Sequence, residues 1–447
     1  MKPLLPALSL LCAASLAACV RTTPEPNVSS NAAADAPAQN TLSPQDRAEI
    51  FDGVWKAINE EYYDPTFRGL DWRAVGERYR PRAESARSDA EFYGVFELML
   101  AELHDGHTVF VWPEAPGAKA EGGGGRGSLG LKLGEADGRV AVVEVEPGTA
   151  AERLNVKPGQ VLREVNGKPV EEHIAFLRSM LAGSSSERLF KAKMLAALLY
   201  GGFLSQPRRL GLTDSDGREF DVELSREPRA ESPNLSARRL DSGAGYIRFR
   251  SWTPPVQEEF GKALAGMLDA PGLVIDLRGN GGGETNVLLD IAGNFFERET
   301  TYGGFRARSG AVQQYRTRPA ARVYRGPVCI VVDEESASAS ESFTAFMQES
   351  GRALVVGRQT AGSTLNRGGR REFKGGAQLL FSTRTYLTPA GRELEGEGVV
   401  PDAPVALTLA DLRAGRDAAL EEAQSQLARA GGARRQKSLL TPTRRAA

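Results

Sequence analysis

The apolar residues of the N-terminal third recur every three or four positions. Between Ser43 and about Leu103 this spacing predicts amphipathic helices, because residues at such intervals share one face of a helix. Ser43 and Pro44 are typical of a helix N-cap and of a first helical turn. The last helix leads into Leu103-His104-Asp105-Gly106-His107-Thr108, where we expect a tight turn before an extended segment. The clearest apolar stripe consists of Phe51, Val54, Trp55, Ile58 and Tyr62.

Residues 122–228 carry the signals of short β-strands instead. Apolar segments flank an Asp137-Gly138 turn, a helical insert is expected at 171–204, and a hairpin turns at 214–217. This succession resembles a PDZ domain of the bacterial protease type, which captures a peptide C-terminus as an added edge strand. The resemblance implies that the backbone amides of Ser128, Leu129 and Gly130 hold the peptide carboxylate.

Residues 236–428 alternate short apolar runs with helical patterns, which is typical of α/β domains. We therefore predict an α/β fold with a mixed-sheet core, an N-terminal helical segment at 44–114 and an inserted β-rich domain. Residues 429–447 contain several arginines and are expected to form a disordered basic tail. Strands of the core are expected at 246–249, 273–277, 328–332 and 354–356.

The first residues have the pattern of a targeting signal. A basic residue precedes the apolar run at 4–16, which is too short to span a bilayer and ends in Leu16-Ala17-Ala18-Cys19. This junction resembles a bacterial lipoprotein processing site, with an ordinary secretory signal as the alternative. We expect a signal peptide at 1–18, a lipid on Cys19 and a flexible tether at 19–43. The protein would then be anchored in the cell envelope facing the periplasm. The non-acidic residue after the cysteine favours the outer membrane.

The composition narrows the function classes. The 447 residues are 41% hydrophobic and 25% charged, as in globular proteins. Lys and Arg total 56 against 57 Asp and Glu, so the net charge of −1 gives no electrostatic argument for binding nucleic acid. The three histidines and three cysteines form no His-Glu-x-x-His or Cys-x-x-Cys motif. We therefore expect no metal and no cofactor.

Two loops after predicted buried strands are candidates for chemistry. In the first, Ser336-Ala337-Ser338-Ala339-Ser340-Glu341 opens a helix. A serine at such a turn lies beside helix-terminal amides that can bind the oxyanion of acyl transfer, although an ordinary N-cap is the simpler interpretation. In the second, Asp276-Leu277-Arg278-Gly279-Asn280-Gly281-Gly282-Gly283 lets the backbone approach a ligand closely. No Gly-Lys-Ser/Thr follows, which argues against a phosphate loop.

Together these loops resemble those of the C-terminal processing, or tail-specific, serine proteases. The segments Thr388-Pro389-Ala390-Gly391-Arg392 and Glu395-Gly396-Glu397-Gly398-Val399-Val400-Pro401-Asp402 fit the same family, as does the PDZ-like region. The resemblance covers nearly the whole chain after the tether and implies that the C-terminal half is a protease core. Ser338 would be the nucleophile, and the amides of Ala339 and Gly282 would form the oxyanion hole.

The catalytic base departs from the pattern of most family members. They use a lysine 25 residues after the serine, where this chain has Ser363, and a neutral serine cannot serve as the base. In the tricorn-core-like branch a histidine replaces the lysine, and the segment around His107 resembles the one that supplies it. His107 would be the general base, with Glu395 fixing its tautomer and Glu397 in reserve. The residue before the histidine carries a hydroxyl in that branch and is Gly106 here, so that hydroxyl is either missing or supplied by Thr108 or Ser363.

The sequence therefore predicts a lipid-anchored serine endopeptidase that cleaves proteins or peptides through an acyl-enzyme. Its PDZ-like domain would capture the free C-termini of substrates. Three alternatives stay open. The first is a non-catalytic protein that binds peptides or a small apolar ligand on the same scaffold. The second is a Ser–Lys protease that uses Lys374, and the third is a purely structural envelope protein.

Overall fold

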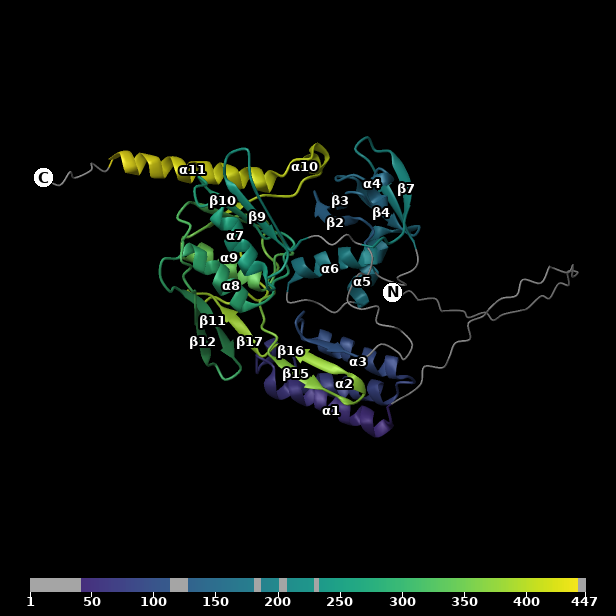
Figure 1. Ribbon diagram of the computed structural model, residues 1–447. Helices are drawn as coiled ribbons and strands as arrows, with labels where there is room; N and C mark the ends of the chain where they lie inside the picture. The colour runs from purple at the N-terminus through teal and green to yellow at the C-terminus, as the bar shows by residue number, and fades with distance from the viewer. Residues whose placement is uncertain (1–41, 113–127, 181–185, 201–206, 229–232, 441–447) are drawn as a thin grey trace, which may run out of the picture. The chain divides into compact units, whose positions relative to one another are not determined.

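The computed structural model describes residues 42–112, 128–180, 186–200, 207–228 and 233–440 (Figure 1). All of these residues belong to one unit, Asn40–Ala447. The expected signal peptide and Cys19 lie outside the described residues, as do Gly122 to Gly125. Across the part of the chain that is described, no helix is both long and apolar enough to cross a bilayer.

Three α-helices form the N-terminal segment: α1 (Pro44–Glu61), α2 (Trp72–Glu84) and α3 (Asp89–Ala101), with the 3-10 helix η1 (Phe67–Gly69). Ser43 caps α1, because its hydroxyl accepts a hydrogen bond from the Asp46 amide while the Asp46 carboxylate accepts one from the Ser43 amide. The expected helices and their capped start are therefore present.

The chain then turns into β1 (Val109–Val111), which lies in a three-stranded antiparallel sheet. Its neighbour is β16 (Gln378–Phe381), and the third strand is β15 (Gly369–Glu372), with the 3-10 helix η3 (Lys374–Gly376) between β15 and β16. Phe110, Leu379 and Phe381 are buried in the same cluster as the apolar faces of the three helices. The segment before His107 and the segment after Ser363 are thereby packed together.

The inserted domain is an antiparallel sheet with the strand order β2-β3-β4-β6-β7, and β5 pairs with β4. Strand β2 lies at the edge of this sheet. The predicted helical insert consists of α5 and α6, and apolar residues of α6 join the core of the sheet. The elements are β2 (Leu131–Ala136), β3 (Arg139–Val145), α4 (Ala150–Arg153), β4 (Val161–Val165), β5 (Lys168–Pro169), α5 (Val170–Met180), α6 (Glu187–Tyr200), β6 (Arg208–Thr213) and β7 (Glu219–Leu224).

The core domain is built on a six-stranded sheet in the order β18-β14-β13-β10-β9-β8. The strands from β18 to β9 are parallel, and β8 is antiparallel. Apolar residues of α7, α8 and α9 pack on one face of the sheet, and those of α11 pack on the other. The elements are β8 (Leu235–Arg239), β9 (Gly245–Phe249), α7 (Val256–Ala265), β10 (Leu273–Asp276), α8 (Thr285–Ala292), η2 (Gly293–Phe295), β13 (Val328–Val332), α9 (Ala339–Glu349), β14 (Leu354–Gly357), β18 (Ala403–Pro404), α10 (Leu409–Ala414) and α11 (Ala418–Leu440).

A smaller antiparallel sheet, β12-β11-β17, completes the core: β11 (Thr301–Ala307), β12 (Val312–Arg316) and β17 (Arg384–Leu387). The predicted fold class, an α/β protein with an N-terminal helical segment and an inserted β-rich domain, is confirmed. Parallel strands direct their carboxyl ends to one edge of a sheet. Both chemical loops therefore start at the same edge, the glycine-rich loop after β10 and the serine loop after β13.

The C-terminal tail differs from the sequence-based expectation. Helix α11 continues to Leu440, so residues 429–440 are helical rather than disordered, and only 441–447 lie outside the described residues. The arginines of this segment suggested a solvated tail, but Ala, Gln, Leu, Arg and Lys are strong helix formers that extend the helix through it.

Candidate active site

Ser338 lies between strand β13 and helix α9 in a strained backbone conformation. Its φ of 55° and ψ of −116° fall outside the regions that a non-glycine residue favours. The Ser338 amide donates hydrogen bonds to the Ser363 carbonyl at 2.8 Å and to Glu341 Oε2 at 3.1 Å. Strain of this kind persists only where the surroundings fix the backbone, and it is concentrated at functional sites.

Glu341 is a fully buried carboxylate that ties the start of α9 to the turn around Ser363. It accepts hydrogen bonds from Thr360 Oγ1 at 2.6 Å, from the Gly362 amide at 2.6 Å and from the Ser363 amide at 2.8 Å. Burial raises the pKa of Glu341, whereas these donors lower it. Glu341 was not among the residues predicted to take part in catalysis. Its place in the first turn of a helix, three residues after a capping serine, was the available signal.

The glycine-rich loop at 279–283 lies so close to Ser338 that a side chain at Gly282 would collide with it. Gly282 has a φ of +101°, and a Cβ atom placed on it would lie 2.6 Å from the Cβ of Ser338. The Gly282 amide donates to Asn280 Oδ1 at 3.0 Å. The Ala339 amide, at the first position of α9, has no hydrogen-bond acceptor among the described residues. Of the two predicted oxyanion donors, Ala339 is therefore unengaged and Gly282 is bound to a side-chain amide.

His107 lies in the turn between α3 and β1, and its side chain is 19% exposed. Its Nδ1 atom is 3.5 Å from Ser363 Oγ and 3.8 Å from Asp105 Oδ1. The Asp105 carboxylate also accepts hydrogen bonds from the His107 amide at 2.7 Å and from Thr108 Oγ1 at 2.5 Å. The structure thus brings His107 beside Ser363, whose carbonyl binds the Ser338 amide.

The electrostatic surroundings favour a neutral imidazole. Burial lowers the pKa of His107 below its ordinary value of 6.5, Asp105 raises it, and the cations Arg367 and Lys193 lower it further. Arg367 Nε also donates to the His107 carbonyl at 2.7 Å, which holds the turn in place. A neutral ring near pH 7 is the form that can accept a proton.

Glu395 is buried, with 7% of its surface exposed, and Thr364 Oγ1 donates to its Oε2 at 3.4 Å. Glu395 Oε2 accepts hydrogen bonds from the amides of Thr364 at 2.5 Å and Leu365 at 3.1 Å. The carboxylate that lies within 4 Å of the imidazole in the described part of the chain is that of Asp105, which the sequence analysis did not consider. Glu397, the reserve candidate, has an exposed side chain.

Helix α6 of the inserted domain touches the turns that carry these residues. Arg188 Nε donates to the Thr360 carbonyl at 3.0 Å, and Arg188 Nη2 donates to the carbonyls of Gly396 at 3.3 Å and Glu397 at 2.6 Å. Further along α6, Lys193 Nζ lies 2.8 Å from the place that a Cβ atom of Gly106 would take. Glycine at 106 therefore leaves room for this lysine beside His107.

The loop predicted to bind a peptide carboxylate is largely engaged within the domain. The Ser128 amide donates to the Glu227 carbonyl at 2.8 Å, and the Gly130 amide donates to Ser128 Oγ at 3.0 Å. Leu129 is buried, and its amide has no acceptor among the described residues.

Lys374, the base of the Ser–Lys alternative, forms its ion pair with helix α1 rather than with the residues around Ser338. Its ammonium pairs with Asp46 Oδ1 at 2.7 Å, and its side chain is 66% exposed. Nothing in the structure brings it to the serine. Among the described residues, no group of three His, Cys, Asp or Glu side chains is arranged to hold a metal ion.

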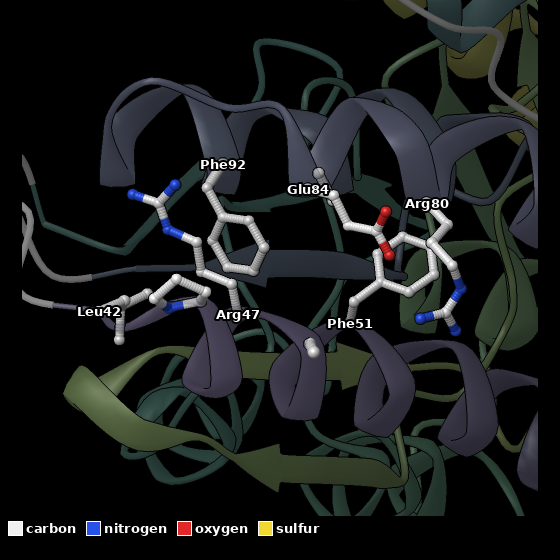
Figure 2. Close-up of a pocket in the computed structure, with 9 residues that line it drawn as sticks. Leu42, Arg47, Phe51, Arg80, Glu84 and Phe92 are labelled. Carbon is white, nitrogen blue, oxygen red and sulfur yellow. The ribbon is translucent and has the colours of Figure 1, made fainter.

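A separate hollow of about 210 Å³ opens between α1, α2 and α3 (Figure 2). Phe51 and Phe92 form its apolar walls, and the guanidinium groups of Arg80 and Arg47 lie over these two rings. Arg47 pairs with Asp89, and Arg80 pairs with Asp52. This hollow contains none of the residues predicted for catalysis.

Comparison with known proteins assigns the chain to a class. Residues 243–405 match the sequence model of peptidase family S41, residues 43–101 match that of the Tricorn protease C1 domain, and residues 119–188 match that of the PDZ domain. The protein is a serine-type peptidase with a PDZ domain.

Its relatives place it more closely. It is 24% identical over 363 residues to carboxyl-terminal-processing peptidase 3, chloroplastic, of Arabidopsis thaliana. The aligned region covers 78% of this chain and 67% of that protein. It is 26% identical over 353 residues to the carboxyl-terminal-processing protease of Synechocystis, covering 78% of each. These matches and relatives together support a C-terminal processing, or tail-specific, serine protease with a PDZ domain.

Solved structures share the fold. The photosystem II D1 C-terminal processing protease superposes with a TM-score of 0.57 at 22% identity, covering 83% of this chain and 98% of that chain. Mature CPAF superposes with a TM-score of 0.63 at 16% identity, covering 83% of this chain and 94% of that chain. At these identities the likeness concerns the fold alone.

Proposed function

We propose that the protein is an endopeptidase in which Ser338 is activated by His107 rather than by a lysine. The observation that carries this proposal is the 3.5 Å approach of His107 Nδ1 to Ser363 Oγ, at the position where most family members have the lysine. The Ser338 amide donates a hydrogen bond to the carbonyl of Ser363 at 2.8 Å. The imidazole therefore lies next to the segment that holds the nucleophile.

The proposed chemistry is acyl transfer. Because Nδ1 of His107 faces Asp105 and Ser363, Nε2 is the atom that takes the proton from Ser338 as Oγ attacks the peptide carbonyl. The Ala339 amide stabilises the oxyanion, and the Gly282 amide joins it by turning away from Asn280. His107 then gives the proton to the leaving amine, and water releases the acyl group through the same base.

Two carboxylates divide the supporting role in this proposal. Asp105 orients the ring and stabilises the imidazolium that forms during the reaction. Glu395 acts one step further away, because its hydrogen bonds fix the amides directly after Ser363. Ser363 supplies the hydroxyl that the glycine before His107 lacks.

The experiment that tests this proposal is steady-state hydrolysis of a peptide or unfolded protein. Ser338→Ala and His107→Ala should each lower kcat/KM by about 10³–10⁶, and the double variant should be little worse than either one. His104→Asn is the matched control, since His104 is exposed on the same turn and asparagine tolerates its φ of 50°. Ser338→Ala with parental activity would refute the mechanism.

We further propose that substrates are held by their C-termini. The edge position of β2 and the unengaged amide of Leu129 support capture of an added peptide strand. A peptide with a free C-terminal carboxylate should bind at least tenfold more tightly than the same peptide with an amidated end. Equal affinities would argue against capture of the carboxylate.

The proposed location is the cell envelope, through a lipid on Cys19. This proposal rests on the Leu-Ala-Ala-Cys junction after a short apolar run. Expressed in a Gram-negative host, the protein should incorporate a labelled fatty acid and fractionate with the outer membrane, whereas Cys19→Ser should do neither. Unlabelled wild-type protein in the soluble fraction would overturn it. A binding protein without activity, the first alternative, is not favoured by the family assignment.

A further inference from the structure

The carboxyl edge of the parallel strands borders a cavity of about 340 Å³ that the proposed catalysis does not use. Four of its lining residues lie where parallel strands end: Arg248 in β9, Arg278 after β10, Asp333 after β13 and Arg358 after β14. Open α/β sheets commonly bind ligands in the crevice outside the carboxyl ends of their strands. The place of this cavity in the fold therefore raises the question of what it holds.

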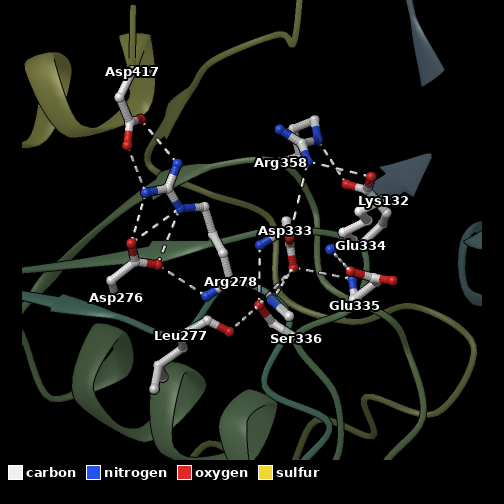
Figure 3. Close-up of polar contacts among 11 residues, drawn as sticks. Lys132, Asp276, Leu277, Arg278, Asp333, Glu334, Glu335, Ser336, Arg358 and Asp417 are labelled. Carbon is white, nitrogen blue, oxygen red and sulfur yellow. Dashed lines mark hydrogen bonds and ion pairs between the residues drawn. The ribbon is translucent and has the colours of Figure 1, made fainter. Parts of the chain in front are cut away.

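The first pair of carboxylates at this edge is occupied by one arginine. Figure 3 shows Arg278 between Asp276 and Asp417. Arg278 Nη2 donates to Asp276 Oδ2 at 2.6 Å and to Asp417 Oδ2 at 2.7 Å, and Nη1 donates to Asp417 Oδ1 at 2.8 Å. Asp276 Oδ2 also accepts the Tyr246 hydroxyl at 2.8 Å. Arg278 thus engages both carboxylates, and the charge of Arg248 also lowers the pKa of Asp276.

The remaining acidic groups of the edge are also paired. Arg358 Nε donates to Glu334 Oε2 at 2.6 Å, and Lys132 pairs with Glu335 (Figure 3). Asp333 Oδ1 accepts hydrogen bonds from backbone amides, among them that of Gly279 at 2.9 Å. Asp411, further round the wall, binds Arg416 Nε at 3.1 Å. Asp333, Asp411 and Asp417 of the lining therefore have their own partners, and Glu144 is an exposed carboxylate of the same lining.

Arg248 is different from the other cations of this cavity. Its Nε atom is buried and has no hydrogen-bond partner, and the described part of the chain supplies no ion pair for its guanidinium. A buried donor without an acceptor destabilises the fold, and more so when the group is charged. Natural proteins keep such groups where a water, an ion or a ligand satisfies them.

We propose that this cavity binds a small oxyanion, a phosphate or carboxylate group, through the guanidinium of Arg248. The planar fork of an arginine matches the paired oxygens of both groups. Lys132, Arg358 and Arg416 line the same space, each already paired with a carboxylate, so Arg248 is the cation left to meet the ligand. Asp333 lines the same cavity and starts the loop that leads to Ser338, so the oxyanion binds at the base of the serine loop.

The test is calorimetric titration of the full chain carrying Ser338→Ala, so that the result does not depend on catalysis. Sodium phosphate and sodium acetate are titrated separately at constant ionic strength set with sodium chloride. We expect saturable one-site binding of at least one of the two anions, and Arg248→Gln should weaken it at least tenfold. Binding of phosphate alone assigns a phosphate group, and binding of acetate alone assigns a carboxylate.

The matched control is Arg250→Gln, which removes the same charge from an exposed residue two positions further along the chain. It should leave the affinity within twofold. Arg248→Lys keeps the charge but loses the planar fork, so it should bind the anion more weakly than the parent. This variant serves as the test if Arg248→Gln is too unstable to measure. The proposal is overturned by no saturable binding of either anion, by parental affinity in Arg248→Lys, or by equal losses in Arg248→Gln and Arg250→Gln.

Discussion

The serine side and the histidine side of the proposed site are held in different ways. Ser338 is fixed from within the core domain, where Glu341 and the Ser363 carbonyl both accept its amide. His107 comes from the N-terminal helical segment and reaches the site through a turn that Asp105 and Arg367 hold. The nucleophile therefore depends on contacts within the core domain, whereas the base depends on packing between segments more than two hundred residues apart.

The largest expected effect is on the serine side. Glu341→Ala should lower the free energy of unfolding by about 3–5 kcal/mol and abolish hydrolysis, because it leaves buried donors of Ser338, Thr360, Gly362 and Ser363 without an acceptor. Urea unfolding followed by circular dichroism measures the loss. Glu349→Ala, which removes a carboxylate from the other end of α9, is the control and should cost about 1 kcal/mol. Equal losses in the two variants would contradict the role given to Glu341.

A smaller effect is expected where the inserted domain touches both sides. Arg188→Met removes the donor to the carbonyls of Thr360, Gly396 and Glu397 but lies outside the chemistry itself. We expect kcat to fall about tenfold, as for a positioning residue, with KM and stability nearly unchanged. Lys191→Met, on the same helix and paired with Glu135, is the control and should stay within twofold. An unchanged kcat in Arg188→Met would separate α6 from catalysis.

The role of His107 as the base can be tested through the pH dependence of the hydrolysis rate. The rate should fall only below pH 6.5, because the pKa of His107 is lowered and a protonated ring cannot accept the serine proton. Arg367→Gln removes a cation that lowers this pKa, so the acid limb of kcat/KM should move to higher pH. Asp105→Asn removes the anion that raises it, so the limb should move to lower pH. Arg370→Gln, exposed nearby on β15, should leave the limb in place, and shifts of the same sign in Arg367→Gln and Asp105→Asn would exclude His107 as the titrating group.

The smallest effect is expected at Lys374. Its ammonium pairs with Asp46 at the surface, so Lys374→Met should leave kcat/KM within twofold of the parent. A surface pair of this kind contributes at most about 1 kcal/mol to stability. Loss of activity without loss of fold would revive the Ser–Lys alternative.

The sequence predicted the features that depend on local patterns, and it missed those that depend on packing between distant segments. The capped helix α1, the turn before β1 and the alternation of strands and helices in the core were predicted, because short-range patterns determine each of them. The sequence also placed both chemical loops after buried strands, and parallel pairing of β10 and β13 brings them to one edge.

The sequence could not identify the neighbours of His107. Asp105 lies two residues away, but its contact with the ring depends on a turn geometry that spacing does not reveal. Glu395 was expected at the imidazole and instead binds the amides of Thr364 and Leu365. The helical tail was missed because its arginines suggested a solvated, disordered segment, although arginine is also a strong helix former. These contacts arise from tertiary packing, which no local pattern encodes.

The most direct test of the central claim is the rate at which a fluorophosphonate labels Ser338. In the parent protein labelling should depend on one group with a pKa below 6.5, and His107→Ala should slow it at least 10³-fold at pH 7 while His104→Asn does not. Intact-protein mass spectrometry follows the reaction, and Ser338→Ala shows that the label is on this serine. If His107→Ala labels at the parental rate, a group other than this imidazole activates the serine.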